Sequence, residues 1–181
     1  MGSLMDALTR WRNSRGFGVH SPFGYYLARM VVNPRKGYAY YGYSDIHRAA
    51  GRGHAPLCRR AETLLRLLVF LRPSSIFMPR NAEAPMRAAV KAAGSHISVL
   101  FRDRDALDCD ILCVRSGRFS IATLTAFISS PGKALLLEDI DDDTCQSLFE
   151  AMQEGIMIRG KKNAILISRP EMQKVKYLMP I

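Results

Sequence analysis

The sequence predicts an α/β protein with one doubly wound, mostly parallel sheet and a helical arm in front of it. Three observations support this prediction. The chain has 181 residues, which is about the length of one domain. After residue 72, short apolar runs alternate with helical stretches, as in repeated β-α-β units. The composition, 48% hydrophobic and 23% charged, is that of a globular chain and excludes the disordered and fibrous classes.

Residues 1–56 form the predicted arm. Two short helices are expected in it, at residues 4–11 and 21–30. Ser21 followed by Pro22 supplies a helix N-cap and a proline at the first helical position. Another short helix is expected after a stretch rich in tyrosine and glycine, with Ser44 as its cap.

Residues 57–181 form the predicted α/β domain. Leucines at helical spacing predict a helix at residues 57–72, which Arg72 and Pro73 end. Strands are expected at residues 75–78, 96–101, 110–114, 133–137, 156–159, 164–167 and 174–179. Helices are expected at residues 82–93, 119–128 and 142–152. The first four strands should be parallel neighbours, and the last two should form an antiparallel C-terminal edge.

The net charge of +10 lies in the front half of the chain. Residues 1–90 hold 14 Lys and Arg against 4 Asp and Glu, whereas residues 91–181 hold 12 of each kind. Within residues 10–60 only Asp45 is acidic, and the basic residues are Arg10, Arg12, Arg15, Arg29, Arg35, Lys36, Arg48, Arg52, Arg59 and Arg60. Basic residues interleaved with aromatic rings suit single-stranded nucleic acid or another anionic partner. The alternative is that this charge only improves solubility.

Neither a membrane span nor a disulfide framework is predicted. The longest apolar runs, at residues 64–71 and 134–137, fall far short of the roughly 18 residues that a span needs. Asp6, Arg10 and Arg12 interrupt any apolar segment of a signal peptide within residues 1–13, so we expect a cytoplasmic protein. The four cysteines, Cys58, Cys109, Cys113 and Cys145, form no CxxC pair and are expected to be mainly buried, reduced thiols.

Motifs near both ends of the chain suggest a family. The arm contains HSPF at residues 20–23, and the C-terminal part contains Glu154-Gly155-Ile156 and RPEMQK at residues 169–174. In this order the motifs resemble those of class I S-adenosylmethionine-dependent methyltransferases, in the bacterial O-methyltransferase-like subgroup with an N-terminal HSPF arm. The resemblance implies a Rossmann-like domain that binds the methyl donor in a glycine-rich loop after the first strand.

The middle of the chain departs from that family pattern. The loop that begins with Met78, Pro79, Arg80 and Asn81 contains no glycine, so its backbone is not expected to let the donor approach. Asp103 lies about one position later than the acidic residue that binds the donor's ribose in the family. Only eight residues, 102–109, separate the second and third strands, so one β-α unit is missing.

Metal-dependent members of the family hold Mg²⁺ between carboxylates after two neighbouring strands. Here Arg115 stands where the first carboxylate is expected, and Glu138 and Asp139 end the later strand. A guanidinium at that position is expected to pair with Asp139 or Glu138, so no metal site is predicted.

The remaining polar residues have structural explanations. Asp141, Asp142 and Asp143 lie at the start of the predicted helix at residues 142–152 and are expected to cap it. Acidic residues 103, 105, 108 and 110 alternate with arginines 102 and 104, as in a solvated loop. His20 is expected to fix the arm by a hydrogen bond, with a general base as the alternative. No catalytic or metal-binding role is predicted for His47, His54 or His96.

The sequence therefore favours a degenerate methyltransferase homologue without catalytic residues or cofactor, acting as a noncatalytic scaffold or interaction protein and forming a homodimer. One alternative is an active S-adenosylmethionine-dependent O-methyltransferase on a small molecule. The other is a nucleic-acid-binding module that uses the basic arm.

Overall fold

The computed structural model describes residues 8, 11, 19, 21–34, 41–51 and 54–181. Most of the predicted helix at residues 4–11 lies outside this part of the chain. So do His20 and the basic residues Arg10, Arg12, Arg15, Arg35, Lys36 and Arg52.

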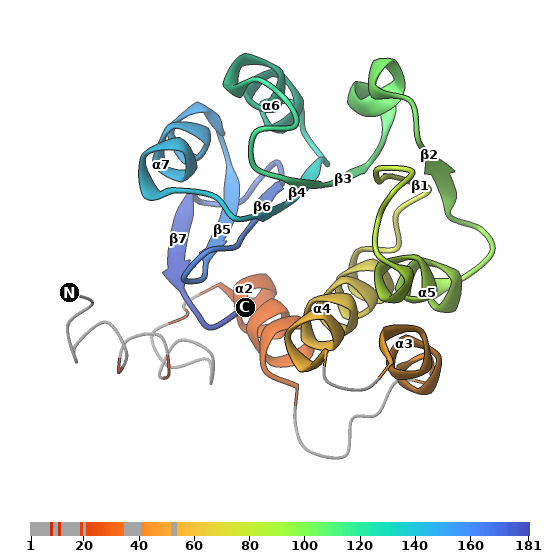
Figure 1. Cartoon of the computed structure of the whole chain (residues 1–181). Coiled ribbons are helices and arrows are strands. Elements are labelled where there is room, and N and C mark those ends of the chain that lie inside the picture. Colours follow the sequence, from red (N-terminus) through yellow and green to blue (C-terminus); the bar gives the residue numbers. More distant parts are fainter. Residues whose placement is uncertain (1–7, 9–10, 12–18, 20, 35–40, 52–53) are drawn as a thin grey trace.

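A single seven-stranded sheet forms the centre of the protein, with the order β2-β1-β3-β4-β6-β5-β7 (Figure 1). The strands are β1 (Ser75–Phe77), β2 (Ser98–Leu100), β3 (Ile111–Arg115), β4 (Ala134–Glu138), β5 (Gly155–Arg159), β6 (Ala164–Ser168) and β7 (Val175–Leu178). The first four are parallel neighbours, as predicted. All seven predicted strands exist, with ends shifted by a residue or two.

The antiparallel C-terminal part of the sheet is confirmed, although its pairing differs from the prediction. β6 runs antiparallel to both β4 and β5, and β7 runs parallel to β5. The predicted pair of β6 with β7 is wrong because β5 lies between them. A tight turn, in which the Gly160 amide donates to the Asn163 carbonyl at 2.8 Å, joins β5 directly to β6 as a hairpin.

Helices cover both faces of the sheet, which makes the fold a Rossmann-like, doubly wound α/β fold. One face carries α2 (Pro22–Tyr26), its π-helical continuation η1 (Leu27–Val32), α4 (Ala55–Leu71) and α5 (Ala84–Ala93), with α3 (Tyr43–Ala50) packed against α5 and α4 (Figure 1). The other face carries η2 (Asp103–Asp108), α6 (Ile121–Ile128) and α7 (Asp142–Ala151). Each face has its own cluster of buried apolar side chains. In the described residues, no helix is long and apolar enough to span a membrane.

Capping side chains fix the start of several helices. Ser21 Oγ accepts from the Gly24 amide at 3.3 Å, as predicted, and Asp141 Oδ1 accepts from the Thr144 amide at 2.7 Å. The predicted cap at Ser44 is wrong, because α3 begins at Tyr43 with Gly42 at its N-cap position, two residues earlier than expected. A Cβ at Gly42 would lie 2.4 Å from the Ala92 Cβ, so glycine permits a close approach to α5 at this position.

Arg66 ties the arm to the rest of the protein. Its Nε donates to the Val31 carbonyl at 2.6 Å and its Nη1 to the Tyr43 hydroxyl, so one buried guanidinium joins α4 to both η1 and α3. Leu27 and Ala28 are fully buried in the same apolar cluster as the sheet residues. The described part of the arm therefore packs into the core of the α/β domain.

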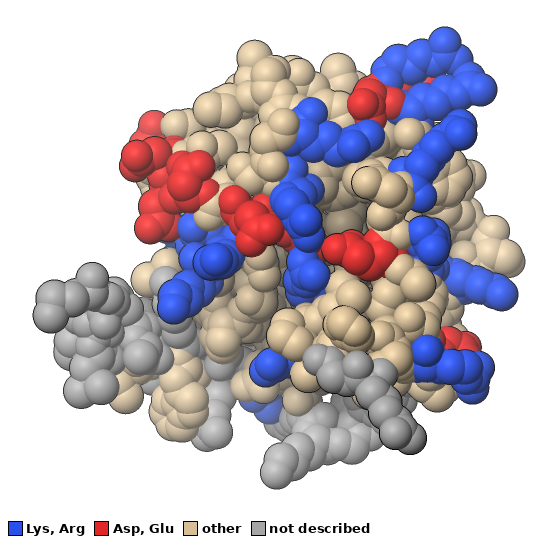
Figure 2. All heavy atoms as spheres, in the orientation of Figure 1, with Lys and Arg blue, Asp and Glu red and all other residues tan. Residues whose placement is uncertain are grey.

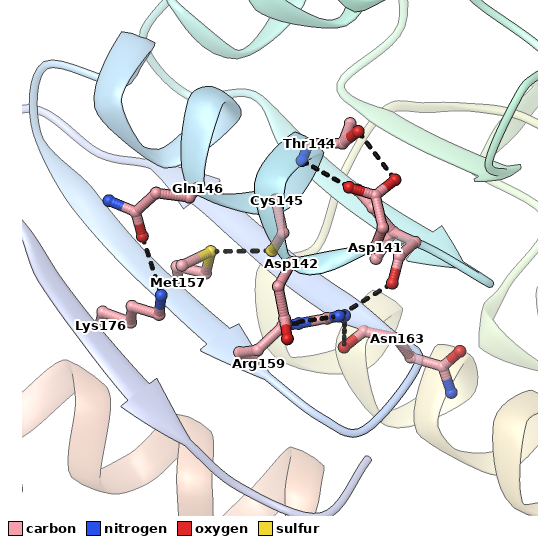
Figure 3. Close-up of polar contacts among 10 residues, drawn as sticks. Asp141, Asp142, Thr144, Cys145, Gln146, Met157, Arg159, Asn163 and Lys176 are labelled. Atoms are coloured by element: carbon pink, nitrogen blue, oxygen red, sulfur yellow. Dashed lines mark hydrogen bonds and ion pairs between the residues drawn. The ribbon is translucent and has the colours of Figure 1, made fainter.

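A second buried arginine, Arg159 at the end of β5, contacts the segment after β4 and the turn before β6 (Figure 3). Its Nη2 donates to the Ile140 carbonyl at 2.8 Å and to Asp142 Oδ1 at 2.9 Å, and its Nη1 donates to the Asn163 carbonyl at 3.2 Å. Asp142 thus neutralises a buried cation in addition to lying in the first turn of α7.

Candidate functional site at the carboxyl edge of the sheet

A cavity of about 460 Å³, here called the β1–β3 cavity, opens where β1, β3 and β4 end. Ligands of open parallel sheets bind at this edge. Predicted site residues Met78, Pro79, Asn81, Asp103 and Arg115 all line it. The other lining residues are Ala82, Glu83, Met86, Cys113, Val114, Ser116, Arg118 and Glu138. Arg80 is not among the lining residues, and Asp139 lies beside Arg115 at the rim.

The glycine-free loop after β1 makes a compact turn along this cavity. The Ala82 amide donates to the Pro79 carbonyl at 2.9 Å, and the Arg87 guanidinium donates to the Ala82 carbonyl. This turn brings Glu83, the residue before α5, to the edge of the cavity. The loop thus presents a carboxylate where the family resemblance implies glycine.

Two arginines and three carboxylates form a charge cluster at the cavity. Arg115 Nε lies 3.3 Å from Asp139 Oδ2, which confirms the predicted pair, and Arg115 Nη2 lies 3.7 Å from Glu138 Oε2. Arg115 Nη2 is also 3.3 Å from Glu83 Oε1. The second arginine is Arg60 of α4, whose Nη1 donates to Glu138 Oε2 at 2.5 Å. Lys and Arg side chains meet Asp and Glu side chains in the middle of the face drawn in Figure 2.

Sequence reasoning missed Arg60 and Glu83. Arg60 is 78 residues from Glu138 along the chain. It reaches the carboxylate only because α4 packs across the sheet with that side chain turned toward the end of β4. The available signal was the position of Arg60 within the predicted leucine-rich helix. Arg60 was instead counted among the basic residues of the arm.

Asp103 pairs with Arg118 on the opposite side of the cavity. Arg118 Nη2 lies 2.7 Å from Asp103 Oδ1, and its guanidinium carbon lies 5.8 Å from the centroid of the Phe77 ring. The segment around Asp103 is the short helix η2 rather than the predicted loop. Asp110 belongs elsewhere: its Oδ2 accepts from the amides of Ser74 and Ser75 at 2.7 and 3.0 Å, which joins β3 to β1 at the opposite edge of the sheet.

Burial changes the acid–base properties of two groups at the cavity. Desolvation raises the pKa of Glu138, although the neighbouring Arg60 guanidinium opposes this effect. Burial also raises the pKa of the Cys113 thiol strongly, and the Glu138 charge adds to the effect. Cys113 is therefore a neutral thiol and a poor nucleophile. In the described part of the chain, no three His, Cys, Asp or Glu side chains are grouped as metal ligands.

A second cavity, here called the arginine cavity, has a volume of about 350 Å³. Its lining residues are Val32, Pro56, Arg59, Arg60, Thr63, Arg66, Asn163, Pro180 and Ile181. Arg60 lines this cavity, while its partner Glu138 lines the β1–β3 cavity. The Arg60–Glu138 ion pair thus lies between the two.

The motifs that suggested a family meet in a groove on another part of the surface. Residues 21–23 of the HSPF motif and residues 169–174 of the RPEMQK motif line one groove of about 830 Å³. The Arg169 guanidinium carbon lies 4.4 Å from the centroid of the Phe23 ring, so the two motifs contact each other directly. This contact gives the motifs a packing role away from the carboxyl edge.

The remaining predicted groups have structural roles. Cys109, Cys113 and Cys145 are free and buried, as expected, and Cys58 is half-buried. His47 Nε2 lies 2.6 Å from Glu62 Oε1.

The fold and this edge define a Rossmann-like α/β protein with a charge-paired cavity at the ends of its parallel strands. Comparison with protein-family models, curated proteins and solved structures gives no match for the chain.

Proposed function

We propose that this chain is a degenerate homologue of class I S-adenosylmethionine-dependent methyltransferases that works without the methyl donor, as a noncatalytic scaffold or interaction protein. The observation that carries the proposal is the contact between Glu83 and Arg115. It spans from the loop after β1 to the end of β3, at the edge where the resemblance implies a donor. The donor's amino acid part would have to displace this charge pair.

The loop and the sheet support the same interpretation. Pro79 offers no backbone N–H, and Asn81 and Glu83 carry side chains where close approach of a ligand to the backbone calls for glycine. The parallel strands β2-β1-β3-β4, followed by the reversed strand β6, form a mostly parallel sheet, which is compatible with the Rossmann-like domain that the resemblance implies.

One observation favours the alternative of an active O-methyltransferase. The β1–β3 cavity, at about 460 Å³, is within the range of small-molecule sites and keeps Asp103 in its wall. In this alternative the donor occupies the cavity in an unusual pose, and Asp103 contacts its ribose.

Nucleic-acid binding by the basic arm is less well supported by the described residues. Arg48 Nη1 pairs with Asp45 Oδ1 at 3.0 Å, and Arg60 pairs with Glu138. Part of the basic charge of the arm is therefore engaged within the chain. If nucleic acid were nevertheless the partner, binding of an oligothymidylate would weaken with salt, with a log–log slope of about −0.7 per phosphate contact.

Calorimetric titration with S-adenosylhomocysteine tests the proposal. We expect no saturable heat at submillimolar ligand, because the loop and the Glu83–Arg115 pair obstruct the donor position. Saturable micromolar binding that Asp103→Ala weakens would overturn the proposal and select the active enzyme. Sedimentation equilibrium of the same sample tests the proposed homodimer, for which a monomer at all concentrations is the contrary result.

A further inference from the structure

The arginine cavity contains a polar stripe of helix α4. Arg59, Thr63 and Arg66 are spaced i, i+4 and i+7, which places them on one face of the helix. Arg60 lies beside this stripe and lines the same cavity. Across from the helix, Asn163 of the β5–β6 turn lines the cavity too.

The positive charge in this cavity is only partly balanced. The Arg66 side chain is 6% exposed, and a guanidinium this deeply buried requires a nearby anion or several acceptors. Its contacts with the Val31 carbonyl, the Tyr43 hydroxyl and Thr63 Oγ1 are to neutral oxygens. The carboxylate paired with it, Glu62, lies at 3.6 Å and also contacts His47 at 2.6 Å.

No acidic side chain is among the described residues that line the cavity. Glu138 lines the β1–β3 cavity and also a small pocket next to the arginine cavity, where its charge is paired with Arg60. The cavity therefore combines three guanidinium-bearing residues with a hydroxyl and an amide side chain. Arg60 and Arg66 each have a carboxylate partner, whereas none of the described carboxylates pairs with Arg59. The Arg59 guanidinium can therefore donate parallel, charge-assisted hydrogen bonds to phosphate oxygens, and the charge of Arg66 adds to the attraction.

We propose that the arginine cavity binds a small phosphate monoester, with the phosphate group hydrogen-bonded to Arg59 and attracted by the nearby charge of Arg66. The volume of about 350 Å³ exceeds that of a lone phosphate ion and leaves room for an organic group. Val32, Pro56, Pro180 and Ile181 provide apolar walls for that group. This site goes beyond the proposed function, because it is separate from the donor position and does not depend on whether the donor binds.

The test is calorimetric titration of the full chain with phenyl phosphate and with inorganic phosphate, at constant ionic strength. We expect saturable binding of both, with phenyl phosphate binding more tightly because of the apolar walls. Arg59→Gln should weaken both by roughly tenfold to a hundredfold, since a charge-assisted hydrogen bond is lost. Arg59 is exposed, so this variant is expected to fold; a thermal melt checks that it does.

The matched control is Arg48→Gln, which removes the same charge from the exposed surface of α3. Its affinity should equal that of the wild type. Absence of saturable binding, an equal loss in both variants, or unchanged binding in Arg59→Gln would each overturn the proposal. S-adenosylhomocysteine is absent from these titrations, so their outcome is independent of the test of the proposed function.

Discussion

Arg60 and Arg115 both reach Glu138, but they differ in how far water screens them. The Arg115 side chain is 56% exposed and its closest approach to Glu138 is 3.7 Å. The Arg60 side chain is 27% exposed and donates a hydrogen bond to Glu138 at 2.5 Å. Exposed ion pairs contribute little to stability, whereas removing one partner of a shielded, hydrogen-bonded pair leaves a charge without compensation.

This contrast predicts different stabilities for two alanine variants. Arg115→Ala should lower the free energy of unfolding by about 0–1 kcal/mol. Arg60→Ala should lower it by about 1.5–3 kcal/mol, because Glu138 loses its charge-assisted hydrogen bond. Urea denaturation of both variants measures the two values. A larger loss for Arg115→Ala than for Arg60→Ala would contradict this assignment.

Glu138 should also make stability depend on pH. Its folded-state pKa is raised above the ordinary value of 4.5, so between these two values the folded chain binds more protons than the unfolded chain. The free energy of unfolding contributed by this group therefore falls as pH rises through that window.

Glu138→Gln isolates this effect. The stability of the wild type minus that of the variant should decrease from about pH 4 to pH 7, and urea denaturation at several pH values measures it. If the difference instead increased with pH, the Arg60 charge would dominate over burial and the pKa of Glu138 would be lowered.

At the residue scale, the Arg115–Asp139 pair was predictable and the Arg60–Glu138 pair was not. Arg115 ends β3 and Asp139 follows β4, and the order of β-α units predicts that these two strands are neighbours in the sheet. Parallel strands place such residues at one edge. The direction of the Arg60 side chain depends on how α4 packs against the arm and the sheet. Periodicity predicts only which face of the helix is apolar.

At the scale of elements, Gly155 has a backbone conformation that an L-residue adopts with strain. Its φ is 129°, and a Cβ there would lie 2.0 Å from the Ile167 carbonyl oxygen. This close approach lets β5 begin directly against the end of β6. The Glu154-Gly155-Ile156 motif thus has a structural explanation at its glycine.

Gly155→Ala should destabilise the fold by roughly 3 kcal/mol or more, since backbone strain and a steric clash add together. Gly132→Ala is the matched control: its φ is 77°, but no atom lies within 4 Å of the added Cβ. The control should lose only about 1–2 kcal/mol. Urea denaturation compares the two, and equal losses would show that the contact with Ile167 relaxes freely.

Element type was easier to predict than strand pairing. The helix at α4 and the buried strands β3 and β4 follow from strong apolar periodicity. The position of β5 between β6 and β7 was missed, because the last two predicted strands, at residues 164–167 and 174–179, were expected to pair with each other. The segment between β6 and β7 instead crosses to the far side of β5, and the Glu171 amide in it donates to Glu154 Oε2 at 2.7 Å.

At the scale of the whole molecule, the arm and the sheet share one apolar cluster. Leu27, Ala28 and Val31 are buried together with Ile156 and other sheet residues. Burial of Leu27 and Val31 alone contributes roughly 3–6 kcal/mol, a large part of the 5–15 kcal/mol typical of a folded domain. The described arm is therefore expected to unfold together with the α/β domain.

This shared core predicts that a destabilising substitution in the arm also destabilises the sheet. Leu27→Ala should lower the free energy of unfolding by about 2–5 kcal/mol, because it leaves a cavity at a fully buried position. Tyr26→Ala, at the neighbouring and 58% exposed position, should change it by no more than about 0.5 kcal/mol. Native-state hydrogen exchange supplies the readout that separates one unit from two. In a single cooperative unit, Leu27→Ala lowers the protection of the Ile165 amide in β6 by the same free energy as that of Val31 in η1. Loss of protection in η1 alone, with Ile165 unchanged, would instead make the arm an independently unfolding segment.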